Sequence, residues 1–120
     1  MYGGSIMKNE RSLLSGNTPM LILSLLDSSD MYGYQMIEEL AQRSENAFQL
    51  KEGTLYPLLH ALEKDKCVRS YTAQTPSGRE RKYYHLTNEG KILLELKKKE
   101  WQMYSKNVNT VIGDVLLSGI

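Results

Sequence analysis

Leucine residues in the middle of the chain recur with the spacing of an amphipathic helix. Four of them fall at positions i, i+3, i+4 and i+7, namely Leu55, Leu58, Leu59 and Leu62. This pattern predicts a helix that buries one face. Pro57 lies in the same segment. Because proline is tolerated only near the start of a helix, we expect this helix to begin at about Thr54.

Further helices are expected upstream. Thr18 is predicted to cap a helix with Pro19 at its first position, after a short helix from about residue 7 that Gly16 closes. A second amphipathic helix is predicted over residues 33–44. Its inward face is expected to consist of Tyr34, Ile37, Leu40 and Ala41. Together with the leucine-rich helix it forms a pair with a short connection, which is typical of a helix-turn-helix.

The periodicity then changes from helical to alternating. Residues 68–75 are rich in β-branched and aromatic side chains, residues 76–78 have the chemistry of a turn, and residues 81–86 predict a second strand. Strand alternation should place Arg81 and Lys82 on opposite faces. Three positions of the second strand are expected to belong to the core: Tyr83, Tyr84 and Leu86. A β-hairpin directly after a helix pair is expected to be a wing.

A long last helix is expected from about residue 88 to residue 116, with Thr87 as its cap. Its apolar positions step by 7, 3, 4, 3 and 4 residues: Leu94, Trp101, Tyr104, Val108, Val111 and Val115. This is the register of a coiled coil, interrupted where Lys97 occupies an apolar position. The pattern favours pairing with a second copy of the chain. The alternative is a helix that folds back over its own core.

These elements predict a mainly α fold with a small β-hairpin wing, which is a winged helix-turn-helix followed by a long C-terminal dimerisation helix. We expect a flexible N-terminal tail over residues 1–6, a DNA-binding domain over residues 7–87, and the dimerisation helix over residues 88–120. A chain of 120 residues has room for one such domain.

The charge is balanced overall but not along the chain. Fifteen basic and fourteen acidic residues give a net charge of +1, so no global charge marks a nucleic-acid partner. Residues 66–91, however, contain six basic and two acidic side chains. Such a local patch can attract phosphates. An ordinary solvated hairpin is the alternative interpretation of the same charges.

Other classes of function lack support in the residues. No nucleophile elbow and no metal-ligand spacing occurs, and His60, Cys67 and His85 fall on three different elements. We therefore expect no enzyme, no metal and no cofactor. No apolar run reaches the length of a membrane span, so no membrane partner is expected. A single cysteine cannot form an internal disulfide, which fits a cytoplasmic location.

Candidate DNA-binding side chains fall on the leucine-rich helix, on the wing and on the helix that precedes the leucine-rich one. An α-helix fits the major groove of B-DNA and reaches base edges near its N-terminus. The polar face of the leucine-rich helix is the candidate for this role, with Thr54, Tyr56, His60 and Lys64. The wing would add Arg79, Arg81 and Lys82, and the preceding helix Tyr34 and Gln35. A solvated helix face is the alternative.

Four blocks of the chain resemble the PadR family of bacterial transcriptional regulators. They are residues 31–35 (MYGYQ), 52–59 (EGTLYPLL) with 62–65 (LEKD), 78–87 (GRERKYYHLT) and Gly90. Their order and spacing agree with the family over about residues 13–104. The resemblance implies a dimeric winged helix-turn-helix repressor that binds double-stranded DNA. A protein–protein docking module built on the same fold is the alternative.

The resemblance also implies an effector site. One branch of the family holds a flat aromatic molecule at the dimer centre between two copies of a tryptophan, and Trp101 matches that residue in position. Leu14 and Ser105 would complete the site. Lys98 stands where the drug-binding branch is apolar, and Ser105 stands where an acid would favour cations. The expected effector is therefore a small aromatic molecule rather than a cationic drug, and the alternative is that Trp101 simply fills the core of the dimer interface.

Overall fold

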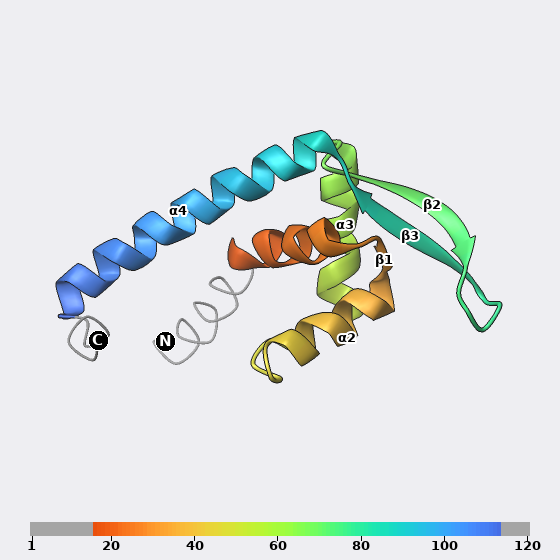
Figure 1. Cartoon of the computed structure of the whole chain (residues 1–120), viewed down its shortest axis with the longest axis horizontal. Helices are drawn as coiled ribbons and strands as arrows, with labels where there is room; N and C mark the ends of the chain where they lie inside the picture. Colours follow the sequence, from red (N-terminus) through yellow and green to blue (C-terminus); the bar gives the residue numbers. More distant parts are fainter. Residues whose placement is uncertain (1–15, 114–120) are drawn as a thin grey trace.

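The computed structural model describes residues 16–113, which form helices around a small antiparallel sheet. In chain order, a helix over residues 16–28 is followed by β1 (Met31–Tyr32), α2 (Gly33–Arg43), α3 (Glu52–Lys64), β2 (Val68–Gln74), β3 (Glu80–Leu86) and α4 (Asn88–Ile112). The first three helices lie together, while the β2–β3 hairpin extends to one side and α4 to the other (Figure 1). The predicted fold class, mainly α with a hairpin wing and a long C-terminal helix, is confirmed. The predicted tail, the short helix before Gly16 and Leu14 lie outside the described residues.

The core lies where these elements meet. Each contributes apolar side chains that are at most 5% exposed: Ile22, Leu23, Leu25 and Leu26 from the first helix, Met36 and Leu40 from α2, Leu55, Leu59 and Leu62 from α3, Val68, Tyr84 and Leu86 from the hairpin, and Leu94 from α4. Burying one such side chain stabilises the fold by about 1.5–3 kcal/mol. The predicted leucine stripe of α3 is thus the inner face of the helix, with Leu58 packed at its margin.

The sheet contains one strand that the hydrophobic pattern did not predict. Its order is β1-β3-β2, and β1 pairs with β3 through only Met31–Tyr84 and Tyr32–Tyr83. A segment of two residues shows no alternation, so it carries no periodic signal. Tyr84 and Leu86 face the core as predicted, whereas Tyr83 is half-buried on the opposite face, where it contacts other tyrosines.

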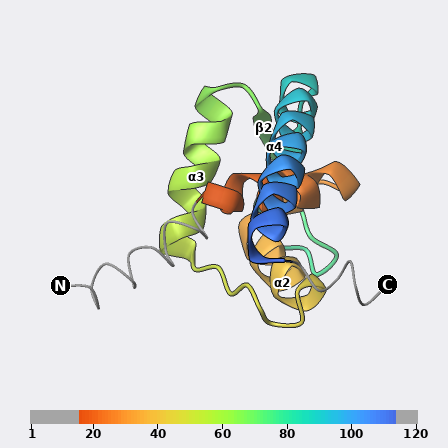
Figure 2. The same ribbon diagram turned by 90° about the vertical axis from the view of Figure 1, so that its left-hand side faces the viewer.

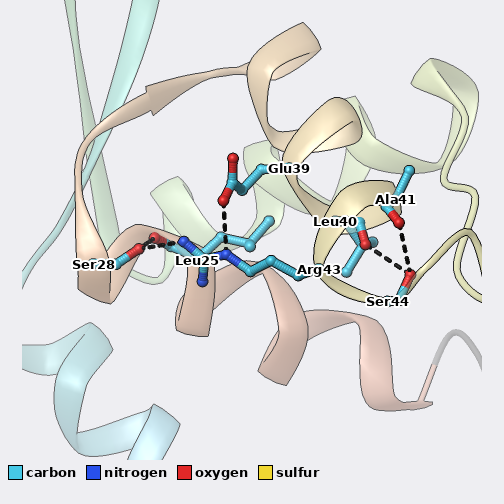
Figure 3. A network of polar contacts seen from close by, with 7 residues as sticks. All are labelled: Leu25, Ser28, Glu39, Leu40, Ala41, Arg43 and Ser44. Carbon is cyan, nitrogen blue, oxygen red and sulfur yellow. Dashed lines mark hydrogen bonds and ion pairs between the residues drawn. The ribbon is translucent and has the colours of Figure 1, made fainter.

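A polar network fixes α2 to the first helix (Figure 3). The Arg43 guanidinium donates from Nε to Glu39 Oε2 at 2.8 Å and from Nη2 to Ser28 Oγ at 2.9 Å. The Ser28 hydroxyl in turn donates to the Leu25 carbonyl at 2.7 Å. Arg43 therefore joins the end of α2 to the end of the preceding helix, beside the apolar contacts between them.

Three details of the predicted helices were wrong. Thr18 was expected to cap its helix and Gly16 to end the previous one, but both are helical. Thr18 is 2% exposed and lies inside the domain instead of at the end of its helix. Tyr34 was expected on the inward face of α2 but is 55% exposed, because that face is formed by Gly33, Met36 and Leu40.

The start of α3 also differs from the prediction. The helix begins at Glu52 instead of Thr54, with Lys51 as an N-cap that makes no side-chain hydrogen bond. Pro57 therefore lies inside the helix and removes the N–H that would bond the carbonyl of Gly53. Both Gly53 and Pro57 are exposed, so water can reach this part of the helix.

The long helix α4 is held to the domain mainly at its start. The Thr87 hydroxyl caps it by accepting from the Gly90 N–H at 3.0 Å, as predicted. A Cβ at Gly90 would overlap the Cys67 carbonyl, so only glycine allows this close packing. Seen from the side to which it extends, α4 passes in front of the first helix, with α3 to one side (Figure 2). It ends at Ile112, before the left-handed Gly113, rather than near residue 116. Val115 lies outside the described residues.

Candidate nucleic-acid interface

A cleft of about 430 Å³ lies between strand β3 of the hairpin and the helix pair. We call it the wing cleft. Three elements line it: the junction of β1 and α2, the exposed side of α3, and β3. Its residues are Tyr32, Gly33, Tyr34, Glu52, Tyr56, His60, Arg81, Lys82 and Tyr84. Five predicted DNA-binding residues are thereby brought together, namely Tyr34, Tyr56, His60, Arg81 and Lys82.

The remaining predicted residues lie outside the cleft. Thr54 is exposed in the first turn of α3, and Lys64 is exposed in its last turn. At about 1.5 Å per residue, some 15 Å of helix separates these two side chains. Gln35 is half-buried, and its side-chain oxygen accepts from the Tyr32 N–H at 3.4 Å. Its described contact is therefore with the start of α2.

Gly33 is a residue of the interface that the hydrophobic pattern did not single out. A Cβ at this position would overlap the phenol of Tyr56. The absence of a side chain lets the Tyr56 ring lie against the start of α2, where it is 38% exposed. The signal in the sequence was a glycine between two tyrosines at a helix start. It indicates a close approach of another group.

The turn of the hairpin presents Arg79 to solvent. Thr75 organises this turn, because its carbonyl accepts from the Gly78 N–H at 2.8 Å and its N–H donates to the Arg79 carbonyl at 2.8 Å. Gly78 has φ +89°, a left-handed conformation that favours glycine. Arg79 then follows as an exposed cation at the tip.

Arg81 and Lys82 leave β3 on opposite faces, as strand alternation predicts. The Arg81 guanidinium carbon lies 5.8 Å from the centre of the Tyr32 ring, and the Lys82 ammonium lies 5.7 Å from the centre of the Tyr84 ring. Both distances allow a cation–π attraction. Burial raises the pKa of the Tyr84 hydroxyl, with the charge of Glu63 adding to the effect, so the ring beneath Lys82 stays uncharged.

Acidic groups near the interface are partly engaged elsewhere. The Glu63 carboxylate accepts from the Ser70 hydroxyl at 2.6 Å and is half-buried beside the sheet. Glu52 lines the wing cleft and is its one carboxylate among the described lining residues. Arg81 and Lys82 outnumber it, so the cleft carries a positive balance even though the whole chain is nearly neutral.

The two predicted effector residues that the structure describes, Trp101 and Ser105, lie on α4, well away from the wing. Trp101 is 44% exposed and stands between two hollows. One, of about 300 Å³, is lined by Gly16, Asn17, Met20, Lys97, Glu100, Trp101 and Tyr104. The other, of about 460 Å³, is lined by α4 alone and includes Ser105. Ser105 and Tyr104 thus belong to different sides of the indole.

Only part of the expected dimer seam is exposed. Leu94 is 1% exposed and packs in the core of its own chain, so it cannot face a partner as predicted. Trp101, Tyr104 and Val111 are 44%, 56% and 85% exposed, while Val108 is half-buried. The exposed apolar part of the seam therefore begins at Trp101, which lies beside the first helix at the hollow described above.

Two features are absent from residues 16–113. No group of three or more histidine, cysteine, aspartate or glutamate side chains in this part of the chain could hold a metal ion. None of its helices is long and apolar enough to cross a membrane.

The helix pair, the three-stranded sheet and the basic hairpin define a winged helix-turn-helix protein. The sequence model of the transcriptional regulator PadR-like family matches residues 22–96. The chain belongs to this family, and its class is that of DNA-binding transcriptional regulators.

Similar proteins agree with this assignment. A PadR family transcription regulator from Clostridium difficile R20291 is 41% identical, with a TM-score of 0.69 over 80% of this chain and 98% of that one. A transcriptional regulator from Clostridium thermocellum is 31% identical, with a TM-score of 0.76 over 82% of this chain and 96% of that one. An uncharacterized protein X from Lysinibacillus sphaericus is 38% identical over 89 residues, which are 74% of this chain and 82% of that protein.

Proposed function

We propose that this regulator is a homodimeric repressor that binds a pseudo-palindromic operator and is released by a small uncharged aromatic molecule. The observation that carries the DNA-binding part is the wing cleft. It joins two cations of β3 to the exposed side of α3. Phosphates bind such cations, while base edges are within reach of a helix that lies in the major groove.

In this arrangement α3 enters the major groove and the hairpin follows the backbone. Thr54 and Tyr56 stand near the N-terminus of α3, where side chains reach base edges. His60 lies one turn further along, and Lys64, exposed in the last turn of α3, would meet a phosphate. Arg79 at the tip of the hairpin suits a narrow minor groove, where negative potential is concentrated.

Dimerisation is supported by the exposed apolar residues of α4. This helix of 25 residues is about 37 Å long, yet Gly90 and Leu94 are its only buried positions. Its second half exposes Trp101, Tyr104 and Val111. Contiguous apolar surface of this kind marks an interface. Two-fold symmetry of the dimer then requires an operator with two half-sites about one helical turn, or 34 Å, apart.

The effector part rests on Trp101 and its surroundings. The Trp101 and Tyr104 rings lie 6.1 Å apart with their planes tilted by 33°. Lys97 and Glu100 line the adjoining hollow and have opposite charges, which favours an uncharged ligand. Stacking on an aromatic ring adds about 0.5–1.5 kcal/mol per face to the burial of a flat molecule. Filling of the dimer interface by Trp101 itself is the competing role.

Footprinting on the promoter regions next to the gene tests the DNA-binding part. We expect two protected half-sites related by two-fold symmetry. Thr54→Ala or Tyr56→Ala should weaken binding to the operator more than binding to random duplex DNA, because only base contacts distinguish the two. Protection of one asymmetric site, or none, would count against the proposal. A docking module would give no footprint at all.

Titration with planar aromatics tests the effector part. Trp101 is the one tryptophan of the chain, so its fluorescence reports on this site alone. We expect quenching by an uncharged or phenolic aromatic together with release of operator DNA. Quenching without release would show a pocket that is not a switch. If no molecule in a broad panel of planar aromatics quenches the fluorescence, Trp101 fills the core of the dimer interface and binds no effector.

A further inference from the structure

The outer face of the sheet, which points away from the core, carries a row of ring contacts. Tyr71 on β2 stacks on Tyr83 on β3, with ring centres 5.7 Å apart and planes 15° from parallel. Tyr83 meets Tyr32 on β1 edge to face at 5.4 Å. Arg81 then lies over the Tyr32 ring at 5.8 Å. One continuous row of side chains therefore crosses all three strands and ends at a cation of the wing cleft.

Asp30 holds the other end of this row. Its Oδ2 accepts from the Tyr71 hydroxyl at 2.6 Å, and its Oδ1 lies 2.9 Å from His85 Nδ1. Asp30 directly precedes β1, so a single carboxylate joins the approach to β1 to both strands of the hairpin. Hydrogen bonds in which one partner is ionised are about twice as strong as neutral ones.

The surroundings of Asp30 favour its charged form. Burial acts to raise the pKa of its carboxyl. The hydrogen bonds from Tyr71 and His85, with the charges of His85 and Arg69, outweigh burial and leave the pKa below its ordinary value. The bond to a carboxylate in turn raises the pKa of the Tyr71 hydroxyl, which therefore remains a donor.

The junction that Asp30 reinforces is otherwise short. Seven residue pairs connect β2 and β3, but only two connect β3 to β1, which leads into α2. The hairpin is consequently a well-paired unit on a small backbone attachment. Its far half, beyond Thr72, has no residue in the buried core, so its direction depends on how its base is held.

We propose that Asp30 is a positioning residue for DNA binding, which holds the hairpin against β1 so that Arg81 is presented to a DNA phosphate at the wing cleft. Asp30 itself touches no DNA and acts through the tyrosine row. The inference rests on the proposed function, because the position of Arg81 matters to binding only if duplex DNA occupies this interface.

Replacing Asp30 by asparagine should change the DNA affinity in opposite directions, depending on whether Asp30 positions Arg81 or acts only through its charge. Loss of one carboxylate makes the chain more positive, which by itself strengthens DNA binding. If Asp30 positions Arg81, binding weakens instead. For Asp30→Asn we expect an affinity at least about threefold lower and a salt slope lower by about one, the signature of one lost phosphate contact. The measurement is fluorescence anisotropy of a short labelled duplex of random sequence over a salt series.

Three further variants of the protein serve as comparisons for Asp30→Asn. Tyr71→Phe keeps the ring stack but loses the hydroxyl bond, so it should weaken binding in the same direction and by less. Asp27→Asn, at an exposed position of the first helix, makes the same change of charge and should bind as tightly as the wild type or more tightly. Asp30→Asn combined with Arg81→Ala should bind no more weakly than Arg81→Ala alone, because both act on one contact.

The outcomes distinguish this inference from the proposed function. Circular dichroism first establishes that each variant is folded at the assay temperature. If Arg81→Ala weakens binding while Asp30→Asn and Tyr71→Phe do not, the positioning role is overturned and the proposed function stands. The positioning role is also overturned if the losses of DNA affinity from Asp30→Asn and from Arg81→Ala multiply in the double variant. A wild-type protein that does not bind duplex DNA overturns the proposed function, and the positioning role with it.

Discussion

Replacement of Gly33 by alanine adds a single atom, Cβ, at the edge of the wing cleft. The new Cβ would overlap the Tyr56 phenol, whereas a Cβ at Gly53, in the first turn of α3, meets nothing within 4 Å. Both glycines lie near helix starts, and alanine gains up to about 1 kcal/mol over glycine in a helix. Overpacking costs about 1–3 kcal/mol where neighbours must shift. Gly33→Ala should therefore be about 1–3 kcal/mol less stable than Gly53→Ala in urea unfolding.

The same substitution should also weaken DNA binding. Tyr56 is 38% exposed, so its ring can turn toward solvent and relieve the overlap. It would then leave the start of α2 and the wing cleft. We expect Gly33→Ala to bind an operator about 5- to 150-fold more weakly, the cost of about 1–3 kcal/mol for one specific contact. Combining it with Tyr56→Ala should restore stability relative to Gly33→Ala. A Gly33→Ala protein as stable as Gly53→Ala that still binds operator DNA normally would refute this reasoning.

Three other expectations follow from burial, charge and exposure. Leu59→Ala should lower the free energy of unfolding by about 2–5 kcal/mol, since Leu59 is fully buried, while His60→Ala on the exposed side should change it by less than about 0.5 kcal/mol in the same urea titration. The lowered pKa of Asp30 means that its contribution to stability is present above the ordinary value of about 4 and is lost as the pH falls through the lowered pKa, so Asp30→Asn should flatten the acid limb of a stability–pH profile. Trp101→Ala should weaken self-association at least about tenfold in analytical ultracentrifugation, and an unchanged dimer would exclude the exposed face of α4 as the interface.

Elements with a long, regular pattern could be predicted from the sequence. The leucines of α3 repeat over two helical turns, and the alternating segments of the hairpin flank residues typical of a β-turn. The type and order of these elements were therefore predicted correctly. Local chemistry also located the cap of α4, because the Thr87 hydroxyl accepts from a free N–H of the first helical turn. The same alternation correctly put Arg81 and Lys82 on opposite faces of β3.

Features that depend on contacts between distant residues could not be predicted. The two-residue strand β1 exists only because β3 lies beside it. Tyr34 and Leu94 were assigned by periodicity alone, yet a glycine takes the inward place beside Tyr34, and Leu94 meets the core of its own chain instead of a partner. Asp30 reaches side chains 41 and 55 residues away, a distance over which no local pattern carries information.

The salt dependence of binding to duplex DNA tests the central claim most directly. The association constant of the wild-type protein and of Arg79→Ala would be measured with one duplex over a range of salt concentrations. We expect a steep linear fall of the logarithm of the association constant with the logarithm of salt, and a slope smaller by about one for Arg79→Ala. Weak binding with a flat slope, identical for the two proteins, would contradict an interface formed by α3 and the hairpin.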